Sequence, residues 1–239
     1  MSIGIIIQAR TKSNRFPRKI YQDINGSYTL QRVLSGAASS KLANKIILAM
    51  PKYDEEEFSQ RLENGEFINY TDSRFCTYFG DEDDVLNRYF MAARENNLSL
   101  VVRITADCPL IQGKVIDEML CEYLDNKHNG FMSNGIAVAT KPYPDGTDVE
   151  IFPYWMLFET WQLASDKSER EHVTKFMYRR GTQYSIHSFD NHRPHSIIDI
   201  SKFPDFSFDT EDDFNLITAI CKNYDTHGDL DKAIRETSI

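Results

Sequence analysis

The 239-residue sequence lacks the cysteine patterns that staple small domains or bind metal. Its four cysteines lie far apart, at Cys76, Cys108, Cys121 and Cys221, and no two of them form a Cys-x-x-Cys pair. Neither a disulfide framework nor a zinc site is indicated, so we expect reduced, mostly buried thiols. With 41% hydrophobic residues, the chain can bury one substantial core without such staples.

Positive charge is also scarce. Asp and Glu outnumber Lys and Arg by 36 to 27, which gives a formal net charge of −9. Binding to duplex nucleic acid by counterion release needs a broad basic surface, so we expect no nucleic-acid partner. The sequence has no apolar run long enough to span a bilayer, and its N-terminus lacks the pattern of a signal peptide. We therefore expect a cytoplasmic protein with no membrane partner.

The positive charge that is present gathers near the N-terminus. An apolar run at Ile3–Ile7 leads into a stretch that contains no acid. This stretch carries the cations Arg10, Lys12, Arg15, Arg18 and Lys19. A solvated loop after a first strand is one interpretation. The reversal of sign at a strand exit in an acidic chain favours another, a loop that presents N–H groups and fixed charge to a nucleotide-sized anion.

Strand-like and helix-like segments alternate through the first half of the chain. Apolar runs predict strands at 3–7, 45–49, 99–104, 146–152, 185–189 and 205–208. Helical periodicity predicts helices at 30–37, 55–63, 83–95, 114–126 and 214–223. Such alternation is typical of right-handed βαβ units, so we expect an α/β fold with a mainly parallel sheet.

The segment 131–199 has a different character, with shorter, aromatic-rich elements interrupted by prolines. We expect an insertion over one edge of the sheet, acting as a lid or dimerisation arm within a single domain that spans 1–239. The aromatic residues between Phe152 and Trp161 have partly helical spacing, which favours packing or a subunit contact over a base-stacking platform.

Two strand-like runs each end in an acid, Asp107 after Val101–Thr105 and Asp209 after Phe206–Phe208. In open α/β sheets, ligands bind outside the carboxyl ends of the strands, so we expect Asp107 close to the basic loop. Two carboxylates from separate strand ends suit Mg²⁺ that shares phosphate oxygens with a nucleotide. A turn residue at Asp107 and a helix cap within 209–213 are the structural alternatives.

Several motifs follow one another in order over nearly the whole chain. They are Gln8-Ala9-Arg10, Arg15-Phe16-Pro17-Arg18-Lys19, 80–89, 103–111, Tyr143-Pro144-Asp145-Gly146, Asp148-Val149-Glu150 and 170–174. Together they resemble the SpsF-like, spore-coat-polysaccharide branch of the cytidylyltransferase family. The resemblance implies a Rossmann-like nucleotide-diphospho-sugar transferase fold, and a homodimer that binds CTP with Mg²⁺. It implies transfer of CMP from CTP to a sugar acid or related surface-glycan precursor, with release of pyrophosphate.

The resemblance also assigns roles to individual positions. Catalytic roles fall to Arg10, Lys19 and Asp107, and Mg²⁺ would be held by Asp107 and Asp209. The positions implied in nucleotide binding are Gln8, Ala9, Arg10, Arg15, Lys19, Asp84, Arg88, Thr105 and Ala106. We expect the acceptor to be bound by Asp145, Gly146, Glu150, Arg170, Glu171 and His172. A structural ion pair at Arg170, and a structural role for His172, remain alternatives to acceptor binding.

Two departures from the family pattern and two rival functions remain open. Phe16-Pro17-Arg18-Lys19 stands where relatives usually have Leu-Pro-Gly-Lys, and Gly26-Ser27-Tyr28-Thr29-Leu30 replaces Gly-x-Pro-Leu. A glycosyltransferase of the same nucleotide-sugar fold is the alternative function, although 105–107 lacks the Asp-x-Asp motif of that class. A non-catalytic nucleotide-binding protein is the second rival, which the presence of both Asp107 and Asp209 disfavours.

Overall fold

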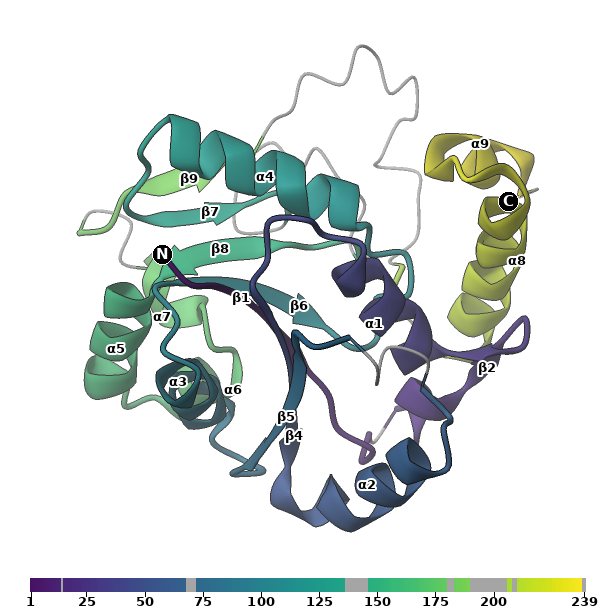
Figure 1. Cartoon of the computed structure of the whole chain (residues 1–239), viewed down its shortest axis with the longest axis horizontal. Coiled ribbons are helices and arrows are strands. Elements are labelled where there is room, and N and C mark those ends of the chain that lie inside the picture. The colour runs from purple at the N-terminus through teal and green to yellow at the C-terminus, as the bar shows by residue number, and fades with distance from the viewer. Residues whose placement is uncertain are drawn as a thin grey trace.

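The computed structural model describes residues 1–13, 15–67, 72–135, 146–179, 183–189, 206–207 and 210–237. Its centre is a seven-stranded sheet with helices on both faces (Figure 1). In order across the sheet, the strands are β5 (Phe75–Gly80), β4 (Lys45–Pro51), β1 (Ile3–Gln8), β6 (Leu100–Thr105), β8 (Glu150–Pro153), β7 (Phe131–Ser133) and β9 (Ile186–Ser188).

The strand directions make the sheet mainly parallel. Strands β5, β4, β1 and β6 are mutually parallel, and β9 is parallel to β7. Within the described part of this sheet, only β8 is antiparallel to its neighbours, β6 and β7. The predicted α/β fold with a mainly parallel sheet is confirmed. Strands β7, β8 and β9 all come from the segment 131–199, which therefore extends the sheet at one edge.

The helices of the described residues are α1 (Thr29–Ala38), α2 (Glu55–Glu63), α3 (Val85–Glu95), α4 (Gly113–Asp125), α5 (Tyr154–Leu163), α6 (Lys167–Glu171), α7 (Lys175–Arg179), α8 (Glu211–His227) and α9 (Leu230–Glu236). The prediction located five of them, α1, α2, α3, α4 and α8, and α2 has the predicted bounds. None of the described helices is both long enough and apolar enough to cross a bilayer.

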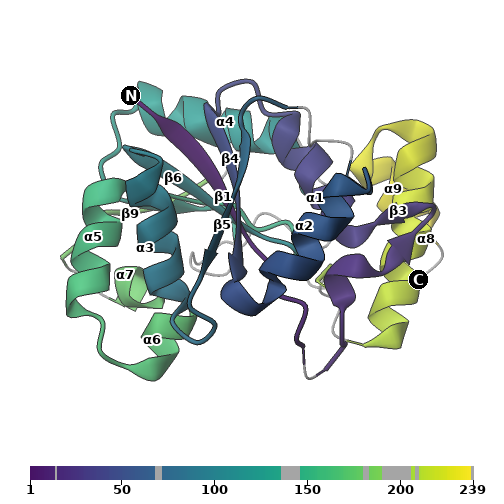
Figure 2. The same cartoon turned by 60° about the horizontal axis from the view of Figure 1, so that its bottom comes forward.

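Successive strand residues point to opposite faces of the sheet, and each face has its own helices. Ile5 and Ile7 lie in the core that α1, α2 and α4 cover. Ile6 lies in the core that α3, α5 and α7 cover. Figure 2 shows these two sets of helices on either side of the strands. Arg103 is the register partner of Ile6, and Gln8 lies two residues after Ile6 on the same strand. Both side chains therefore point to the face of the sheet that α3 covers.

Helix α3 is fixed to the sheet by both apolar and polar contacts. Val85, Leu86 and Phe90 are buried on the face that the periodicity predicts. The buried hydroxyl of Tyr89 donates to the backbone carbonyl oxygens of Ile6 at 3.2 Å and of Ile104 at 3.4 Å. Since those carbonyls belong to β1 and β6, this one side chain ties the helix to both strands.

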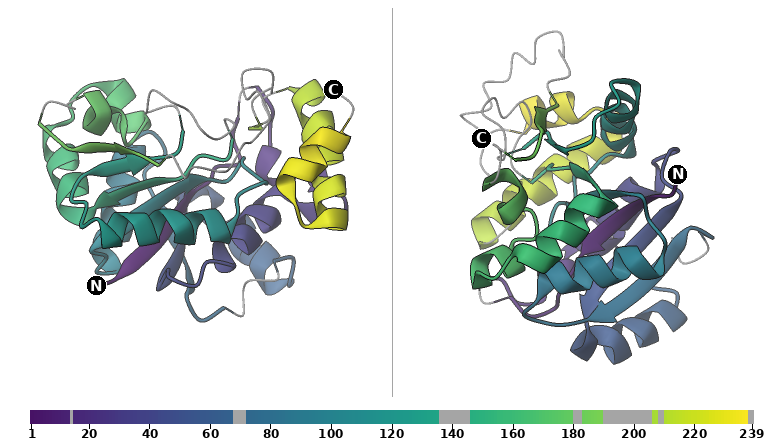
Figure 3. Two further views of the ribbon diagram at one scale, coloured as in Figure 1. Left: turned by 90° about the horizontal axis from the view of Figure 1, so that it is seen from above. Right: turned by 90° about the vertical axis from the view of Figure 1, so that its left-hand side faces the viewer.

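A third core lies at the C-terminal end of the chain. Helices α8 and α9 pack side by side against the hairpin of β2 (Asp23–Ile24) and β3 (Ser27–Tyr28) (Figure 3). Thr210 caps α8 in a capping box with Asp213, as the acidic run predicts. Phe206 is fully buried in this core. The strand predicted at 205–208 is not found at Phe206 and Ser207, which form a bend, and residues 205 and 208 lie outside the described ranges.

Other strand predictions differ from the structure. The strand predicted at 146–152 starts only at Glu150, since Gly146 has a φ of +84° and begins a turn. Strands β5, β7 and the β2–β3 hairpin were not predicted. All four cysteines are free thiols, of which Cys108 and Cys221 are buried, Cys76 is half-buried and Cys121 is exposed.

Candidate active site

A cleft of about 290 Å³ lies at the carboxyl ends of β1 and β6. The described residues that line it are Gln8, Ala9, Arg10, Ser13, Arg15, Lys19, Ile20, Arg103, Thr105, Ala106, Asp107, Glu171 and His172. Gln8 and Thr105 are register partners on these two neighbouring strands, and both line the opening. This edge of a parallel sheet is where ligands bind in open α/β folds. The cleft brings together the basic loop, the end of β6 and two residues of the predicted acceptor site.

The basic loop after β1 is closed by its own backbone. The amide of Arg18 donates to the carbonyl oxygen of Thr11 at 3.0 Å, and the amide of Phe16 donates to Ser13 Oγ at 3.3 Å. Arg18 stands where relatives usually have glycine and takes a left-handed φ of 57°. Its side chain pairs with Glu57 and lies over the ring of Tyr21, away from the cleft. The loop therefore keeps the left-handed conformation that glycine favours at this position, and the Arg18 side chain adds no further cation to the cleft.

A buried carboxylate holds the start of this loop. Asp54, only 2% exposed, accepts hydrogen bonds from the backbone amide of Thr11 at 3.1 Å and from its hydroxyl at 2.5 Å. Burial raises the pKa of Asp54, and the hydrogen bonds from Thr11 offset only part of that rise. The next residue, Lys12, lies over the ring of Tyr53 at 3.7 Å from its centroid. The turn after β4 thus fixes the segment that leaves β1.

Lys19 and Asp107 form an ion pair within the cleft. Their side chains are 15% and 22% exposed, so the pair is shielded but reachable by a ligand. Burial opposes ionisation of Asp107, but the Lys19 ammonium outweighs it and lowers the pKa of the carboxyl. Arg10 lines the same cleft from the end of β1. The expected proximity of Arg10, Lys19 and Asp107 is therefore found.

Of the two predicted metal ligands, the described residues contain Asp107. Asp209, the second predicted ligand, and Asp145 of the predicted acceptor site lie outside the described residues. Among the described residues, no three His, Cys, Asp or Glu side chains converge as a metal site would require. Mg²⁺ keeps several waters and needs one or two carboxylates plus substrate phosphates. Asp107 lies near the end of β6 in a cleft that arginine and lysine side chains also line, so it fits the role of one such carboxylate.

Arg103 reaches the cleft from β6, and sequence reasoning missed it. Its Nη1 donates at 2.6 Å to Glu150, its register partner on β8. Burial lowers the pKa of Arg103, but the Glu150 carboxylate outweighs this effect and raises it above the usual value. Glu150 also accepts from the hydroxyl of Thr174 at 3.1 and 3.2 Å and is only 7% exposed. Glu150, predicted to touch the acceptor, instead lies behind Arg103.

Two further predicted residues bind each other. Arg170 donates from Nε to both carboxylate oxygens of Asp84, at 3.0 and 3.1 Å. Its Nη1 donates to the carbonyl oxygen of Trp161 at 2.7 Å. Neither residue lines the cleft. Of the two readings that the sequence left open for Arg170, the structural ion pair is the one found.

Arg88 and Gly146 also lie away from the cleft lining. Arg88 is fully buried on α3 and donates to the carbonyl oxygen of Asp81, and burial lowers its pKa. Gly146 packs against the backbone of Phe206 and Ser207 so closely that a Cβ would lie 2.3 Å from their atoms. In the structure, neither residue lies on the surface of the opening.

Ser13, Ile20 and Arg103 line the cleft without having been predicted. A signal for Arg103 is present in the sequence. It is a cation inside an otherwise apolar run, two positions before Thr105 and four before Asp107. Charged side chains are almost never buried in strands unless they are paired, and residues two apart share one face. That spacing places Arg103 and Thr105 on one face of the sheet, and both line the cleft.

Solved structures of nucleotidyltransferases share this architecture. A cytidylyltransferase from Leptospira borgpetersenii serovar Hardjo-bovis superposes with a TM-score of 0.79 at 24% identity, over 98% of this chain and 92% of that chain. A CMP:2-keto-3-deoxy-manno-octonic acid synthetase complexed with CTP gives a TM-score of 0.59 at 16% identity, over 79% of this chain and 89% of that chain. The fold is that of an α/β nucleotidyltransferase.

The sequence narrows this class. Residues 4–224 match the cytidylyltransferase family, and the chain belongs to that family. An uncharacterized protein of Methanocaldococcus jannaschii is 31% identical over 186 residues, which is 78% of this chain and 71% of that protein. A 3-deoxy-manno-octulosonate cytidylyltransferase of Chloroherpeton thalassium is 27% identical over 129 residues, covering 53% of this chain and about half, 48%, of that relative.

The spore coat polysaccharide biosynthesis protein SpsF of Bacillus subtilis is a more distant relative. It is 22% identical over 190 residues, which is 77% of this chain and 73% of that protein. The predicted membership of the cytidylyltransferase family is thus confirmed. Within the family, SpsF stands beside 3-deoxy-manno-octulosonate cytidylyltransferases among the relatives of this chain.

Proposed function

We propose that this protein transfers CMP from CTP to a sugar acid or a related surface-glycan precursor, with release of pyrophosphate. The observation that carries the proposal is the convergence of Arg10, Lys19 and Asp107 on one cleft in a member of the cytidylyltransferase family. The relatives add support, since one is a 3-deoxy-manno-octulosonate cytidylyltransferase and one synthetase structure was solved with CTP. We place the chain in the SpsF-like branch on the motifs that it shares with that branch.

In this mechanism an oxygen of the acceptor attacks the α-phosphorus of CTP, and pyrophosphate leaves in line. The reaction needs little covalent help but much charge neutralisation and positioning. Arg10, Arg15 and Lys19 would bind the triphosphate and neutralise the leaving pyrophosphate. Gln8, Ala9, Thr105 and Ala106 would line the nucleotide site beside them.

Asp107 would hold Mg²⁺, with Asp209 as a second proposed ligand. The ion, when bound, supplies positive charge to the phosphate oxygens. The same carboxylate now contacts Lys19, so CTP must separate the pair. Lys19 would then exchange its bond to Asp107 for one to a phosphate, which keeps its charge compensated throughout.

Glu171 and His172 would form the acceptor side of the cleft. The chain that carries them is held on one side by Arg170, bonded to Asp84, and on the other by Thr174, bonded to Glu150. Such fixing reduces the freedom that acceptor binding must remove. His172 would accept a proton from an acceptor hydroxyl or position it. Asp145 and Gly146 complete the proposed acceptor region.

We also propose a homodimer within which 131–199 serves as the acceptor and dimerisation segment. Helix α5, in this segment, exposes Trp155, Phe158 and Leu163 by 41%, 39% and 50%, which is unusual for large apolar side chains on one helix. Sedimentation of the purified protein tests the assembly, and a monomer at micromolar concentration contradicts it.

A pyrophosphate-release screen tests the proposed function. Four nucleoside triphosphates are crossed with a panel of sugar acids, neutral sugars and sugar phosphates, with and without Mg²⁺. We expect release only with CTP, an acceptor and Mg²⁺. Turnover of a nucleotide-sugar without CTP would instead indicate a glycosyltransferase, and CTP binding without turnover on any acceptor would indicate a binding protein.

A further inference from the structure

Arg103 is the cation of the cleft that the basic loop does not supply. It lies on β6, on the same sheet face as Thr105, and is the register partner of Ile6 on β1. Its side chain is 17% exposed and contributes to the lining of the cleft. Lys19, from the basic loop, is already engaged with Asp107. Arg103 is therefore a cation of the cleft that is anchored separately from the basic loop, through Glu150.

The guanidinium of Arg103 is held in place through one of its N–H groups, while another has no partner among the described residues. Its Nη1 donates to Glu150, and Glu150 is itself fixed by Thr174. The Nε atom of Arg103 is buried and has no hydrogen-bond partner within the described residues. The neighbouring hydroxyl of Tyr89 donates to backbone carbonyls. A buried donor without a partner is costly and calls for an explanation, and a ligand that contacts the 17% of the side chain left exposed at the cleft provides one.

The chemistry of the site limits the group that Arg103 can bind. A guanidinium presents its N–H groups as a planar fork that matches the two oxygens of a carboxylate. Glu150 behind Arg103 and Glu171 in the lining are both acidic. A phosphate dianion would bring two negative charges next to these two carboxylates, and one guanidinium could not compensate them all. A carboxylate ligand brings only one negative charge and is repelled less.

We propose that Arg103 binds the carboxylate of the acceptor and so selects sugar acids over neutral sugars and sugar phosphates. The inference rests on the proposed function, since it assigns one end of the same cleft to the acceptor. Glu150 and Thr174 are positioning residues for Arg103. The basic loop takes the triphosphate, and Arg103 takes the acid, so one cleft holds two anionic substrates on separately anchored cations.

Steady-state kinetics on paired acceptors test this assignment. The probes are 3-deoxy-manno-octulosonate and other 2-keto-3-deoxy sugar acids, each beside its carboxyl-reduced counterpart, together with sugar phosphates. For Arg103→Gln, we expect the KM for the acid to rise about 10- to 100-fold, because a hydrogen bond to a charged group is lost. The KM for CTP should stay within about twofold of wild type, since only the basic loop contacts the triphosphate. Arg103→Lys should be intermediate, because it keeps the charge and loses the fork.

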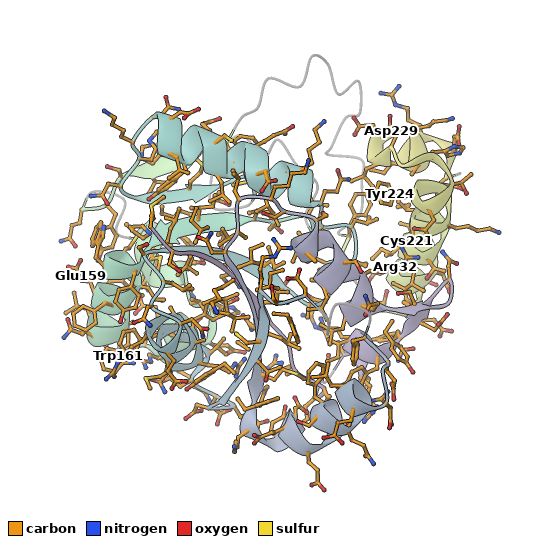
Figure 4. All side chains as sticks on the ribbon, in the orientation of Figure 1. Arg32, Glu159, Trp161, Cys221, Tyr224 and Asp229 are labelled. Atoms are coloured by element: carbon orange, nitrogen blue, oxygen red, sulfur yellow. The ribbon has the colours of Figure 1, made fainter. Side chains whose placement is uncertain are left out.

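Loss of Arg103 alone leaves Glu150 buried and unpaired, which can impair folding. The double variant Arg103→Gln with Glu150→Gln avoids that problem and should show the same selective loss. Arg32→Gln is the matched control, because Arg32 is also ion-paired, to Asp225, and its side chain is 12% exposed. Arg32 extends from α1 toward α8, beside Cys221 and Tyr224 (Figure 4), and does not line the cleft. Its variant should leave both KM values unchanged.

The outcomes separate this inference from the proposed function. Wild-type protein that uses a carboxyl-reduced sugar or a sugar phosphate as well as the acid overturns the role of Arg103, whatever the variants do. An equal rise in the KM for CTP and for the acid overturns it too. CTP binding by calorimetry without turnover on any acid rejects the carboxylate class, while absence of CTP binding rejects the proposed function itself.

Discussion

Arg170 and Asp84 join two parts of the molecule that are 86 residues apart in sequence. Arg170 Nε donates to both oxygens of Asp84, and Asp84 Oδ1 also accepts from the amide of Asn87 at 2.9 Å as the N-cap of α3. The side chains are 21% and 30% exposed, so solvent screens the pair only in part. This contact ties the end of α6, where the proposed acceptor residues begin, to the start of the helix that Tyr89 fixes to β1 and β6.

A double-mutant cycle on this pair should give a coupling free energy of about 1–2 kcal/mol in urea unfolding, since the partners are close and partly shielded. The variants are Asp84→Asn, Arg170→Gln and both together. Asp84→Asn keeps an oxygen for the cap, so its cost measures the ion pair. Asp84→Ala should cost about 1 kcal/mol more, because it also removes the cap. A coupling near zero would mean that the pair does not brace α6.

The Asp54 contact with Thr11 predicts a variant that affects both stability and CTP binding. Asparagine at position 54 offers one acceptor oxygen where two are used, so the amide of Thr11 would lose its partner. We expect Asp54→Asn to cost about 1–3 kcal/mol of unfolding free energy and to raise the KM for CTP by loosening the basic loop. Thr11→Val, which loses only the hydroxyl bond, should have a smaller effect on both quantities.

The same carboxyl has a defined pH signature. Burial raises the pKa of Asp54 above the unfolded value of about 3.9, so the folded protein holds this proton more tightly. Stability contributed by this group therefore increases as the pH falls from the folded pKa toward about 4. The difference in unfolding free energy between wild type and Asp54→Asn should widen on acidification from pH 7. A difference that narrows would show that Thr11 lowers this pKa instead.

The sequence predicted the parts of the fold that local patterns encode. Helix α2 has the bounds that were predicted, and strands β1, β4 and β6 are largely buried apolar runs. Strand β5 was missed because all of its residues are half-buried at an edge of the sheet, which gives no apolar alternation. The hairpin at 23–28 has strands of two residues each, too short for any periodicity.

The site was predictable where residues lie next to a strand end and not where tertiary pairing decides. Arg10 and Asp107 come shortly after β1 and β6, so their proximity follows from strand order, whereas Lys19 reaches Asp107 through the loop after β1. Arg170 and Asp84 could not be recognised as partners, because no local sequence pattern indicates which acid an arginine will pair with. For the same reason, Glu150 was assigned to the acceptor, whereas in the structure its carboxylate accepts hydrogen bonds from Arg103 and Thr174.

Gly146 and Gly26 provide a matched test of close packing. Both have a left-handed φ, +84° and +82°, but a Cβ at Gly146 would meet the backbone of Phe206 and Ser207 at 2.3 Å, whereas nothing lies within 4 Å at Gly26. Gly26→Ala should cost about 1–2 kcal/mol in unfolding free energy from the conformation alone. Gly146→Ala should cost about 1–3 kcal/mol more, from overpacking. Equal costs would mean that the contact with Phe206 is readily relieved.

The Lys19–Asp107 ion pair leads to a test of the proposed chemistry. Lys19→Met removes the cation that would neutralise the leaving pyrophosphate, so turnover with CTP should fall about 100-fold or more. Lys12→Met is the control from the same loop, because Lys12 is 64% exposed, pairs with Glu82 and does not line the cleft. Its turnover should stay within about threefold of wild type, since a screened surface charge contributes little. Circular dichroism checks that both variants fold. If Lys12→Met loses activity and Lys19→Met keeps it, the triphosphate binds along the outer side of the loop, and the cleft is not the reaction centre.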